Sequence, residues 1–217
     1  MVKQTWAKIC GLRLLEDVLF CQKAGACAVG LNFWPNSKRY LDPAVARTWI
    51  QDLPNETELL RVGVFVNEPT EKITDLLQSE VIHIAQLHGD ESPQDCAKIR
   101  AAGFRVWKAI GVRDASSLSI LPDYQVDGVV LDAFCPGEYG GSGKTFQWPL
   151  AVQAQEMIPD TPIILSGGLT ADNVAEAVSH THPAGVDVAS GVESAPGVKD
   201  RTLIERFIQA VQREGSA

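Results

Sequence analysis

Cys10 and Asp132 are the two residues of this sequence best suited to proton transfer, and each ends a predicted strand. A thiolate can remove a proton from carbon or act as a nucleophile, and nearby positive charge lowers a thiol pKa. A carboxyl group can donate a proton, although it can equally cap a helix or stay solvated. A buried cysteine is also often only a small apolar side chain, so the two residues gain meaning from their positions.

Two groups of small residues, Ser166-Gly167-Gly168 and Ser190-Gly191, suit the binding of an anion. Glycine and serine let backbone N–H groups approach a ligand near the start of a helix. Either group alone could serve only to make a tight turn. Together, after the last two predicted strands, they favour a phosphate site.

Other polar residues extend this candidate site. The guanidinium of Arg39, in the loop after the second strand, suits a carboxylate through paired hydrogen bonds, although loop arginines are often only solvated. Gln86 and His88 share one face of the fourth strand and His83 points to the other, so a two-histidine metal site is not expected.

The segment Gly140-Gly-Ser-Gly-Lys-Thr145 nearly matches a nucleotide-binding P-loop. A P-loop requires glycine five residues before Gly143, where this chain has Glu138. The next helix is also predicted to begin near Pro149, too late for that motif. We therefore predict a flexible, glycine-rich lid after the sixth strand.

Strand-like and helix-like segments alternate eight times along the chain. This pattern predicts parallel strands with right-handed crossovers in a single domain, residues 1–217. Eight units in this length favour an α/β fold, a closed (β/α)8 TIM barrel, over an open doubly wound sheet. The predicted strands are Trp6–Cys10, Ala28–Phe33, Leu60–Val66, Val81–Leu87, Arg105–Ile110, Gly128–Asp132, Pro162–Leu165 and Gly185–Ala189. The predicted helices are Leu14–Lys23, Pro43–Gln51, Glu71–Gln78, Pro93–Ala102, Asp114–Leu121, Pro149–Met157, Ala171–Ser179 and Asp200–Arg213.

In such a barrel the site lies at the carboxyl ends of the strands. The first and sixth strands are three apart around the ring, so Cys10 and Asp132 are expected to face each other across the mouth. A sugar could then lie between them.

Composition narrows the class of partner. The net charge is −8 and no Lys/Arg cluster occurs, so a nucleic-acid partner is not expected. The five cysteines are odd in number and lack C-x-x-C spacing, which argues against a disulfide framework or a zinc site. No signal-like or membrane-spanning segment occurs, so we expect a cytoplasmic protein, either a monomer or a homodimer.

The ordered motifs resemble the phosphoribosylanthranilate isomerases of tryptophan biosynthesis nearly from end to end. Departures from the usual pattern occur at Gly30-Leu-Asn-Phe33, Asn36, Lys38 and Ala189, and none touches Cys10, Asp132 or Arg39. The motifs that carry the resemblance are Lys8-Ile-Cys-Gly11, Pro35-Asn-Ser-Lys-Arg-Tyr40, Gly63-Val-Phe-Val-Asn67, Gln86-Leu-His-Gly-Asp-Glu91, Leu131-Asp-Ala133, Gly140-Gly-Ser-Gly-Lys-Thr-Phe146, Ser166-Gly-Gly-Leu169, Val186-Asp-Val-Ala-Ser-Gly-Val-Glu193 and Pro196-Gly-Val-Lys-Asp200.

The resemblance implies an aldose–ketose isomerase that rearranges N-(5-phosphoribosyl)anthranilate. Cys10 would be the general base and Asp132 the general acid, with Asp187 in support. The remaining residues would bind the substrate: Arg39 the anthranilate carboxylate, Gly167, Gly168, Ser190 and Gly191 the phosphate, and Gln86 and His88 other parts of it. The substrate would supply its own electron sink, so neither a metal nor an organic cofactor is expected.

Two other interpretations stay open at this point. A related phosphate-binding barrel, such as indole-glycerol-phosphate synthase, needs Lys and Glu at strand ends, and here only Lys108 on the fifth strand fits. A non-catalytic phosphosugar-binding domain would keep the glycine turns but would need neither Cys10 nor Asp132.

Overall fold

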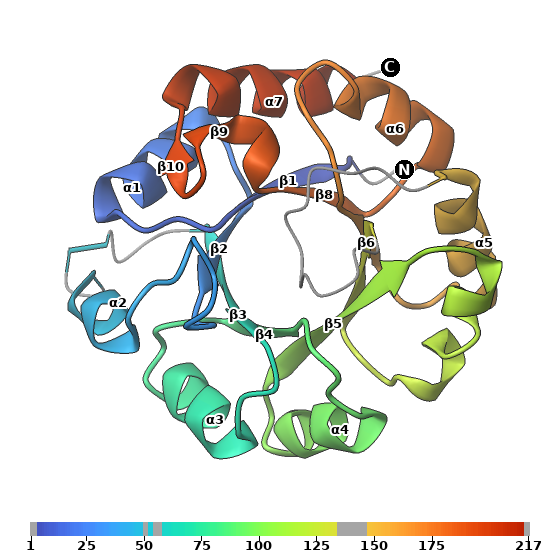
Figure 1. Ribbon diagram of the computed structural model, residues 1–217, viewed down its shortest axis with the longest axis horizontal. Helices are drawn as coiled ribbons and strands as arrows, with labels where there is room; N and C mark the ends of the chain where they lie inside the picture. Colours follow the sequence, from blue (N-terminus) through green and yellow to red (C-terminus); the bar gives the residue numbers. More distant parts are fainter. Residues whose placement is uncertain (1–3, 50–51, 54–57, 134–146, 215–217) are drawn as a thin grey trace.

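Eight parallel strands close into a barrel in the computed structural model, with the helices arranged around the outside (Figure 1). The structure describes residues 4–49, 52–53, 58–133 and 147–214. The predicted TIM barrel with eight parallel strands is therefore confirmed. The barrel strands are β1 (Trp6–Cys10), β2 (Ala28–Asn32), β3 (Leu60–Phe65), β4 (Ile84–Leu87), β5 (Arg105–Val112), β6 (Gly128–Ala133), β7 (Ile163–Leu165) and β8 (Gly185–Val188).

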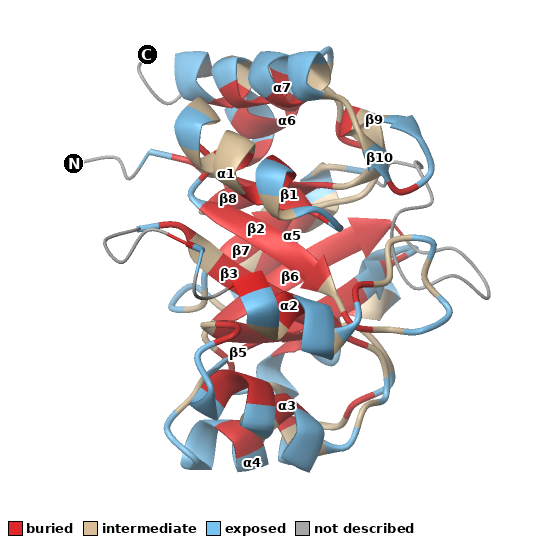
Figure 2. Cartoon of the chain, turned by 90° about the vertical axis from the view of Figure 1, so that its left-hand side faces the viewer, coloured by how far each residue is buried: buried red, intermediate tan, exposed pale blue. Residues whose placement is uncertain are grey.

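Most connections between the strands contain an α-helix, which buries one face against the barrel and exposes the other to solvent (Figure 2). The helix α4, for example, begins with a capping box in which Ser92 and Asp95 bond to each other's backbone N–H groups. None of the described helices is long and apolar enough to cross a membrane. The helices are α1 (Leu15–Ala24), α2 (Pro43–Trp49), α3 (Thr70–Gln78), α4 (Pro93–Ala101), α5 (Pro149–Met157), α6 (Val174–Thr181) and α7 (Arg201–Glu214).

The prediction of an α-helix over Asp114–Leu121 was wrong. The structure has two short 3-10 turns there, η1 (Ala115–Leu118) and η2 (Leu121–Asp123). Asp114 Oδ1 accepts the N–H of Ser116, and Ser117 Oγ accepts the N–H of Arg113, at 3.0 and 3.2 Å. Such side-chain bonds to the backbone compete with an α-helix, and Pro122 removes a further donor.

A second difference lies after β8. The chain forms a 3-10 turn, η3 (Ser190–Val192), and then a short hairpin of β9 (Glu193–Ala195) and β10 (Val198–Lys199) before α7 begins. Neither a strand nor a helix was expected in this segment from the sequence. The hairpin contributes two charged residues to the barrel mouth, as described below.

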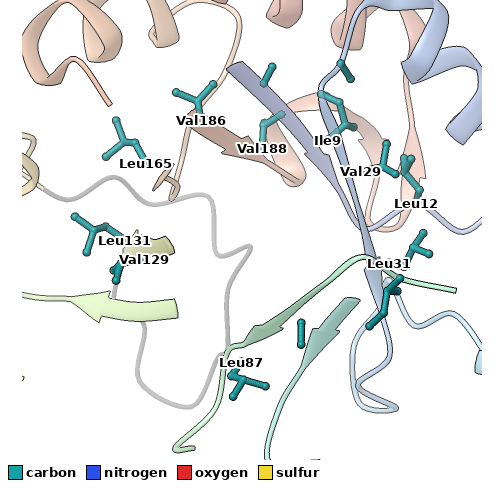
Figure 3. Close-up of a cluster of buried hydrophobic side chains, with 14 of the residues drawn as sticks. Ile9, Leu12, Val29, Leu31, Leu87, Val129, Leu131, Leu165, Val186 and Val188 are labelled. Carbon is teal, nitrogen blue, oxygen red and sulfur yellow. The ribbon is translucent and has the colours of Figure 1, made fainter. Parts of the chain in front are cut away.

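Both faces of the barrel strands are buried, as expected for a fully parallel sheet. The outward side chains pack against the helices in the main core, part of which Figure 3 shows around Ile9, Leu31 and Val186. The inward side chains form a smaller cluster at the amino-terminal half of the barrel, with Trp6 stacked on Trp107 at 5.6 Å between ring centroids. This apolar filling confines the polar inward residues to the other half.

Candidate active site

Polar side chains fill the carboxyl-terminal half of the barrel interior. Lys8 and Asp187 are directly paired in register across β1 and β8, and Cys10 follows Lys8 on the same face of β1. Strand alternation places Ile9, between them, in the outer core. Gln86 on β4 reaches the same interior, where it contacts Lys8.

Lys8 is fully buried and lies at the centre of this group. Its Nζ donates to Asp187 Oδ2 at 2.8 Å and to Gln86 Oε1 at 3.0 Å. Burial alone would lower the pKa of Lys8, but the negative charge of Asp187 and the neighbouring Cys10 outweigh it and raise the pKa. Among the described residues, no hydrogen-bond partner is found for Asp187 Oδ1.

The thiol of Cys10 is almost completely buried beside this cluster and lies over Gly30. A Cβ atom added at Gly30 would come within 2.5 Å of Cys10 Sγ, so only glycine leaves the sulfur in place. Burial is the main factor that raises the pKa of Cys10, and the charge of Asp187 raises it further. The ammonium groups of Lys8 and Lys199 act in the opposite direction, but the pKa stays above its ordinary value.

Asp132 is the last residue but one of β6 and lies on the other side of the mouth. Its Oδ1 accepts the backbone N–H of Ala133 at 2.9 Å, and its Oδ2 lies 3.3 Å from Nε2 of His88. A Cβ at Gly167 would lie 3.0 Å from Asp132 Oδ1 and 2.6 Å from Ala133 N, and Gly167 also has φ +83°. The turn after β7 therefore needs glycine to lie this close to the carboxyl group.

Arg39 is held at the same mouth by a second ionic cluster. Its Nε and Nη2 donate to the two carboxylate oxygens of Glu193 at 2.7 and 2.9 Å. Lys199 Nζ donates to the same carboxylate at 2.8 Å and to the carbonyl of Ala189. Burial works against the charge of Glu193, but these hydrogen bonds outweigh it and lower the pKa of the carboxyl group.

Burial opposes the charge of the Arg39 guanidinium, but the hydrogen bonds and charge of Glu193, followed by the charges of Cys10 and Asp132, raise its pKa. The aliphatic stem of Arg39 passes over Gly11, where a Cβ atom would come within 2.4 Å of it. The thiol, the carboxyl group and the guanidinium therefore share one site.

The two glycine turns predicted to hold phosphate are also side by side. Gly167 and Gly168 both have positive φ, and a Cβ at Gly191 would collide with the carbonyl oxygen of Leu169. The turn η3 places Ser190 and Gly191 at its amino end, where backbone N–H groups lack intrahelical partners. This is the arrangement that favours anion binding after strands seven and eight of a barrel.

The structure thus brings together Cys10, Asp132, Arg39, His88, Asp187 and both glycine turns, and places Gln86 beneath them. Sequence reasoning missed Lys8, Lys199 and Glu193. Each is a charged residue within one of the motifs that carry the resemblance, and Lys8 is in addition a charged residue in an apolar strand, a signal that could have identified it. The predicted lid at Gly140–Thr145 lies outside the described residues and stays a prediction.

Lys108 does not belong to the mouth. Its Nζ bonds to Glu91 Oε2 at 2.9 Å and to the carbonyl of Gly89 at 2.7 Å, while the neighbouring Trp107 faces the barrel interior. It ties the loop after β4 to β5, and it is not available as the strand-end lysine that the synthase interpretation requires.

Comparison with known proteins identifies the family to which the chain belongs. A family model described as N-(5′-phosphoribosyl)anthranilate (PRA) isomerase matches residues 7–210. This chain belongs to that family. The isomerase of Pelobacter propionicus is 44% identical over 209 residues, covering 96% of each chain.

Two solved isomerase structures are similarly close. One is a monomeric form of the dimeric PRA isomerase of Thermotoga maritima, with TM-score 0.84 and 39% identity. The other contains reduced 1-(o-carboxyphenylamino)-1-deoxyribulose 5-phosphate, with TM-score 0.85 and 38% identity. Each comparison covers 97% of this chain and 100% of the other. The chain is a PRA isomerase of tryptophan biosynthesis, an aldose–ketose isomerase, and the resemblance predicted from the sequence is confirmed.

The surroundings of Cys10 predict how its thiol titrates. The difference in ultraviolet thiolate absorbance between the PRA isomerase and its Cys10→Ser variant should have a midpoint above the ordinary thiol pKa. Lys199→Met should move this midpoint higher, because the variant loses a cation that stabilises the thiolate. Lys98→Met, which removes an exposed lysine, should leave it unchanged. A midpoint that falls in Lys199→Met would contradict this electrostatic account.

Proposed function

We propose that Cys10 and Asp132 are the general base and general acid of the isomerisation. The observation that carries this proposal is their shared site: both side chains point inward at the carboxyl ends of β1 and β6, and the contacts of Lys8 with Gln86, Gln86 with His88 and His88 with Asp132 join their surroundings. A thiol and a carboxyl group on different sides of one mouth can act on different faces of the same sugar.

The first step opens the furanose ring. Asp132 donates its proton to the ring oxygen as the bond between that oxygen and C1 breaks. The nitrogen lone pair forms a C1=N double bond, which leaves an iminium ion conjugated with the aromatic ring. Asp132 becomes a carboxylate in this step, and its contacts with Ala133 N–H and His88 remain in place to stabilise that charge.

The second step removes a proton from C2. Cys10 acts in its ionised form, whose share rises with pH because burial raises the pKa of the thiol. The thiolate takes this proton, and the released electron pair forms the C1=C2 bond while the iminium nitrogen becomes neutral. The resulting enolamine loses its C2 hydroxyl proton and gains a proton at C1, which gives the aminoketose. No atoms are gained or lost overall, and the iminium nitrogen serves as the electron sink.

Binding groups surround these two residues. We propose that Arg39 holds the anthranilate carboxylate, using the part of its guanidinium that Glu193 does not occupy. The backbone of Gly168, Ser190 and Gly191 would hold the phosphate. Asp187 Oδ1, which finds no partner among the described residues, is suited to accept a sugar hydroxyl.

Substitution of the two proton-transfer residues tests the central roles. Cys10→Ala and Asp132→Asn should each lower kcat by about 10²–10⁴-fold, the range expected for loss of one acid or base. KM should change little, because neither variant alters the phosphate turns. The decrease in substrate fluorescence during turnover of PRA measures both constants. Near-normal turnover in either variant would remove the role assigned to that residue.

Substitution of Arg39 tests the carboxylate site. Arg39→Ala should raise KM by about 10–100-fold, since hydrogen bonds to charged groups contribute roughly 1.5–3 kcal/mol. Arg39→Lys should restore part of the affinity, because it keeps the charge but loses the paired geometry. Arg47→Ala, in an ion pair with Asp75 on the protein surface, is the matched control. If Arg39→Ala lowers only the thermal stability and leaves KM unchanged, Arg39 is not the carboxylate ligand.

We further propose that the chain forms a homodimer, as the Thermotoga maritima relative does. A cavity of about 380 Å3 at the amino-terminal end of the barrel, lined by Trp6, Leu60 and Trp107 and also by Arg105 and Asp127, is the surface that we assign to the second copy. Sedimentation equilibrium at micromolar concentration should give twice the mass of the chain, and the mass of one chain would contradict a homodimer.

A cytoplasmic location also stays a proposal. The thiols of Cys10, Cys21, Cys27 and Cys96 are free, which suits a reducing compartment. Recovery of the enzyme from a periplasmic or membrane fraction would contradict it.

A further inference from the structure

A chain of hydrogen bonds crosses the barrel from β1 to β6 below the mouth. Lys8 contacts Gln86, Gln86 contacts His88, and His88 contacts Asp132, at 3.0, 3.0 and 3.3 Å. We propose that Gln86 is a positioning residue: it fixes the proton of neutral His88 on Nε2, so that His88 donates to Asp132 during catalysis. The catalytic part of this inference rests on the acid role proposed above for Asp132.

Lys8 fixes the orientation of the Gln86 amide. An ammonium group has only donors, so the atom of Gln86 that faces Lys8 Nζ must be the carbonyl oxygen Oε1. Turning the amide over would bring its NH2 group against the ammonium group. Both side chains are fully buried, so water does not relieve that clash and the amide has one permitted orientation.

The orientation of the amide then decides the tautomer of His88. With Oε1 toward Lys8, the amide nitrogen of Gln86 faces Nδ1 of His88, and an amide nitrogen can only donate. Nδ1 must therefore accept, and the proton of the neutral ring lies on Nε2. The ring edge that carries this proton is the edge that faces Asp132 Oδ2.

This proton matters when Asp132 releases its own. A hydrogen bond to an ionised carboxylate is stronger than one to a neutral carboxyl group, so the Nε2–H group favours transfer from Asp132 to the ring oxygen. The other tautomer would direct an Nε2 lone pair at the forming carboxylate and oppose the transfer. The separation of 3.3 Å is long for this bond, as is common in a site without substrate.

The arrangement also connects acid and base through one ammonium group. Lys8, which orients Gln86, is bonded to Asp187 and lies beside the thiol of Cys10. In the ring of strands, β4 lies across the interior from β1 and β8 (Figure 1). Gln86 links the two sides of that interior, because its amide contacts Lys8 at one end and His88 at the other.

Gln86→Glu tests the inference, because the substituted carboxylate has the same shape and can accept from Lys8 but cannot donate to His88. Two-bond 1H–15N correlation spectra of the protein with 15N-labelled histidine report the protonation of each ring nitrogen. His88 of the wild-type enzyme should show an unprotonated Nδ1 and a protonated Nε2, and Gln86→Glu should show a protonated Nδ1. Where the spectra of this variant show that Nε2 has lost its proton, kcat should fall by about 10–100-fold, the range found when a partner that orients a metal-ligating histidine is removed, with little change in KM.

His83 provides an internal control. Its Nδ1 accepts the backbone N–H of Arg61 on the outer side of the barrel, so its signals should not respond to Gln86→Glu. The variants His83→Gln and His88→Asn assign the two sets of signals, and the first should keep full activity. If Gln86→Glu does not fold, Gln86→Leu replaces it; it removes the donor, and His88 should lose its single tautomer.

Two results would overturn the inference: a wild-type His88 with its proton on Nδ1, or a Gln86 variant in which the His88 tautomer is unchanged while kcat falls. The spectra are recorded without substrate, so they test the His88 tautomer even if Asp132→Asn retains turnover. That outcome would reject the acid role of Asp132 and leave the tautomer assignment intact.

Discussion

The organisation of this active site depends on one buried positive charge. An ammonium group without contact to water is costly unless it is paired and hydrogen-bonded, and Lys8 satisfies this requirement with Asp187 and Gln86. Asp187 lies on β8 and Gln86 on β4, on opposite sides of the barrel. The ammonium group of Lys8 therefore holds side chains from both sides of the mouth in fixed positions. The thiol of Cys10 lies within its field, and the carboxyl group of Asp132 is reached through Gln86 and His88. A single residue on β1 thereby influences both of the side chains that we propose transfer protons.

A second ionic cluster organises the rim. Glu193, on the hairpin after β8, forms ion pairs with Arg39 from the loop after β2 and with Lys199 from the end of the same hairpin. Two cations around one carboxylate leave a net positive charge, which suits a substrate with a carboxylate and a phosphate. The whole chain carries −8, so the attraction for such a substrate is local.

The eight strands and the faces of their side chains could be predicted from the sequence, whereas the 3-10 turns and the long-range ionic contacts could not. Alternation of short apolar runs with helical segments was sufficient for the eight strands, because parallel strands buried on both faces leave that pattern. The period of two along each strand placed Cys10 with Lys8 and separated His83 from His88. The 3-10 turns at Ala115–Asp123 were not predictable, because local serine and aspartate bonds overcame a helical pattern. The contacts of Lys8 with Gln86 and of Arg39 with Glu193 join residues 78 and 154 positions apart, and no local pattern encodes them.

The central claim is that Cys10 and Asp132 act on opposite sides of one phosphorylated sugar. A crystal structure of this enzyme with reduced 1-(o-carboxyphenylamino)-1-deoxyribulose 5-phosphate tests it most directly. The account predicts the phosphate at Gly168, Ser190 and Gly191, with Cys10 Sγ in contact with C2 on one face of the sugar chain and Asp132 on the other. A phosphate bound away from these turns, or a sugar carbon chain that touches only one of the two side chains, would contradict the account.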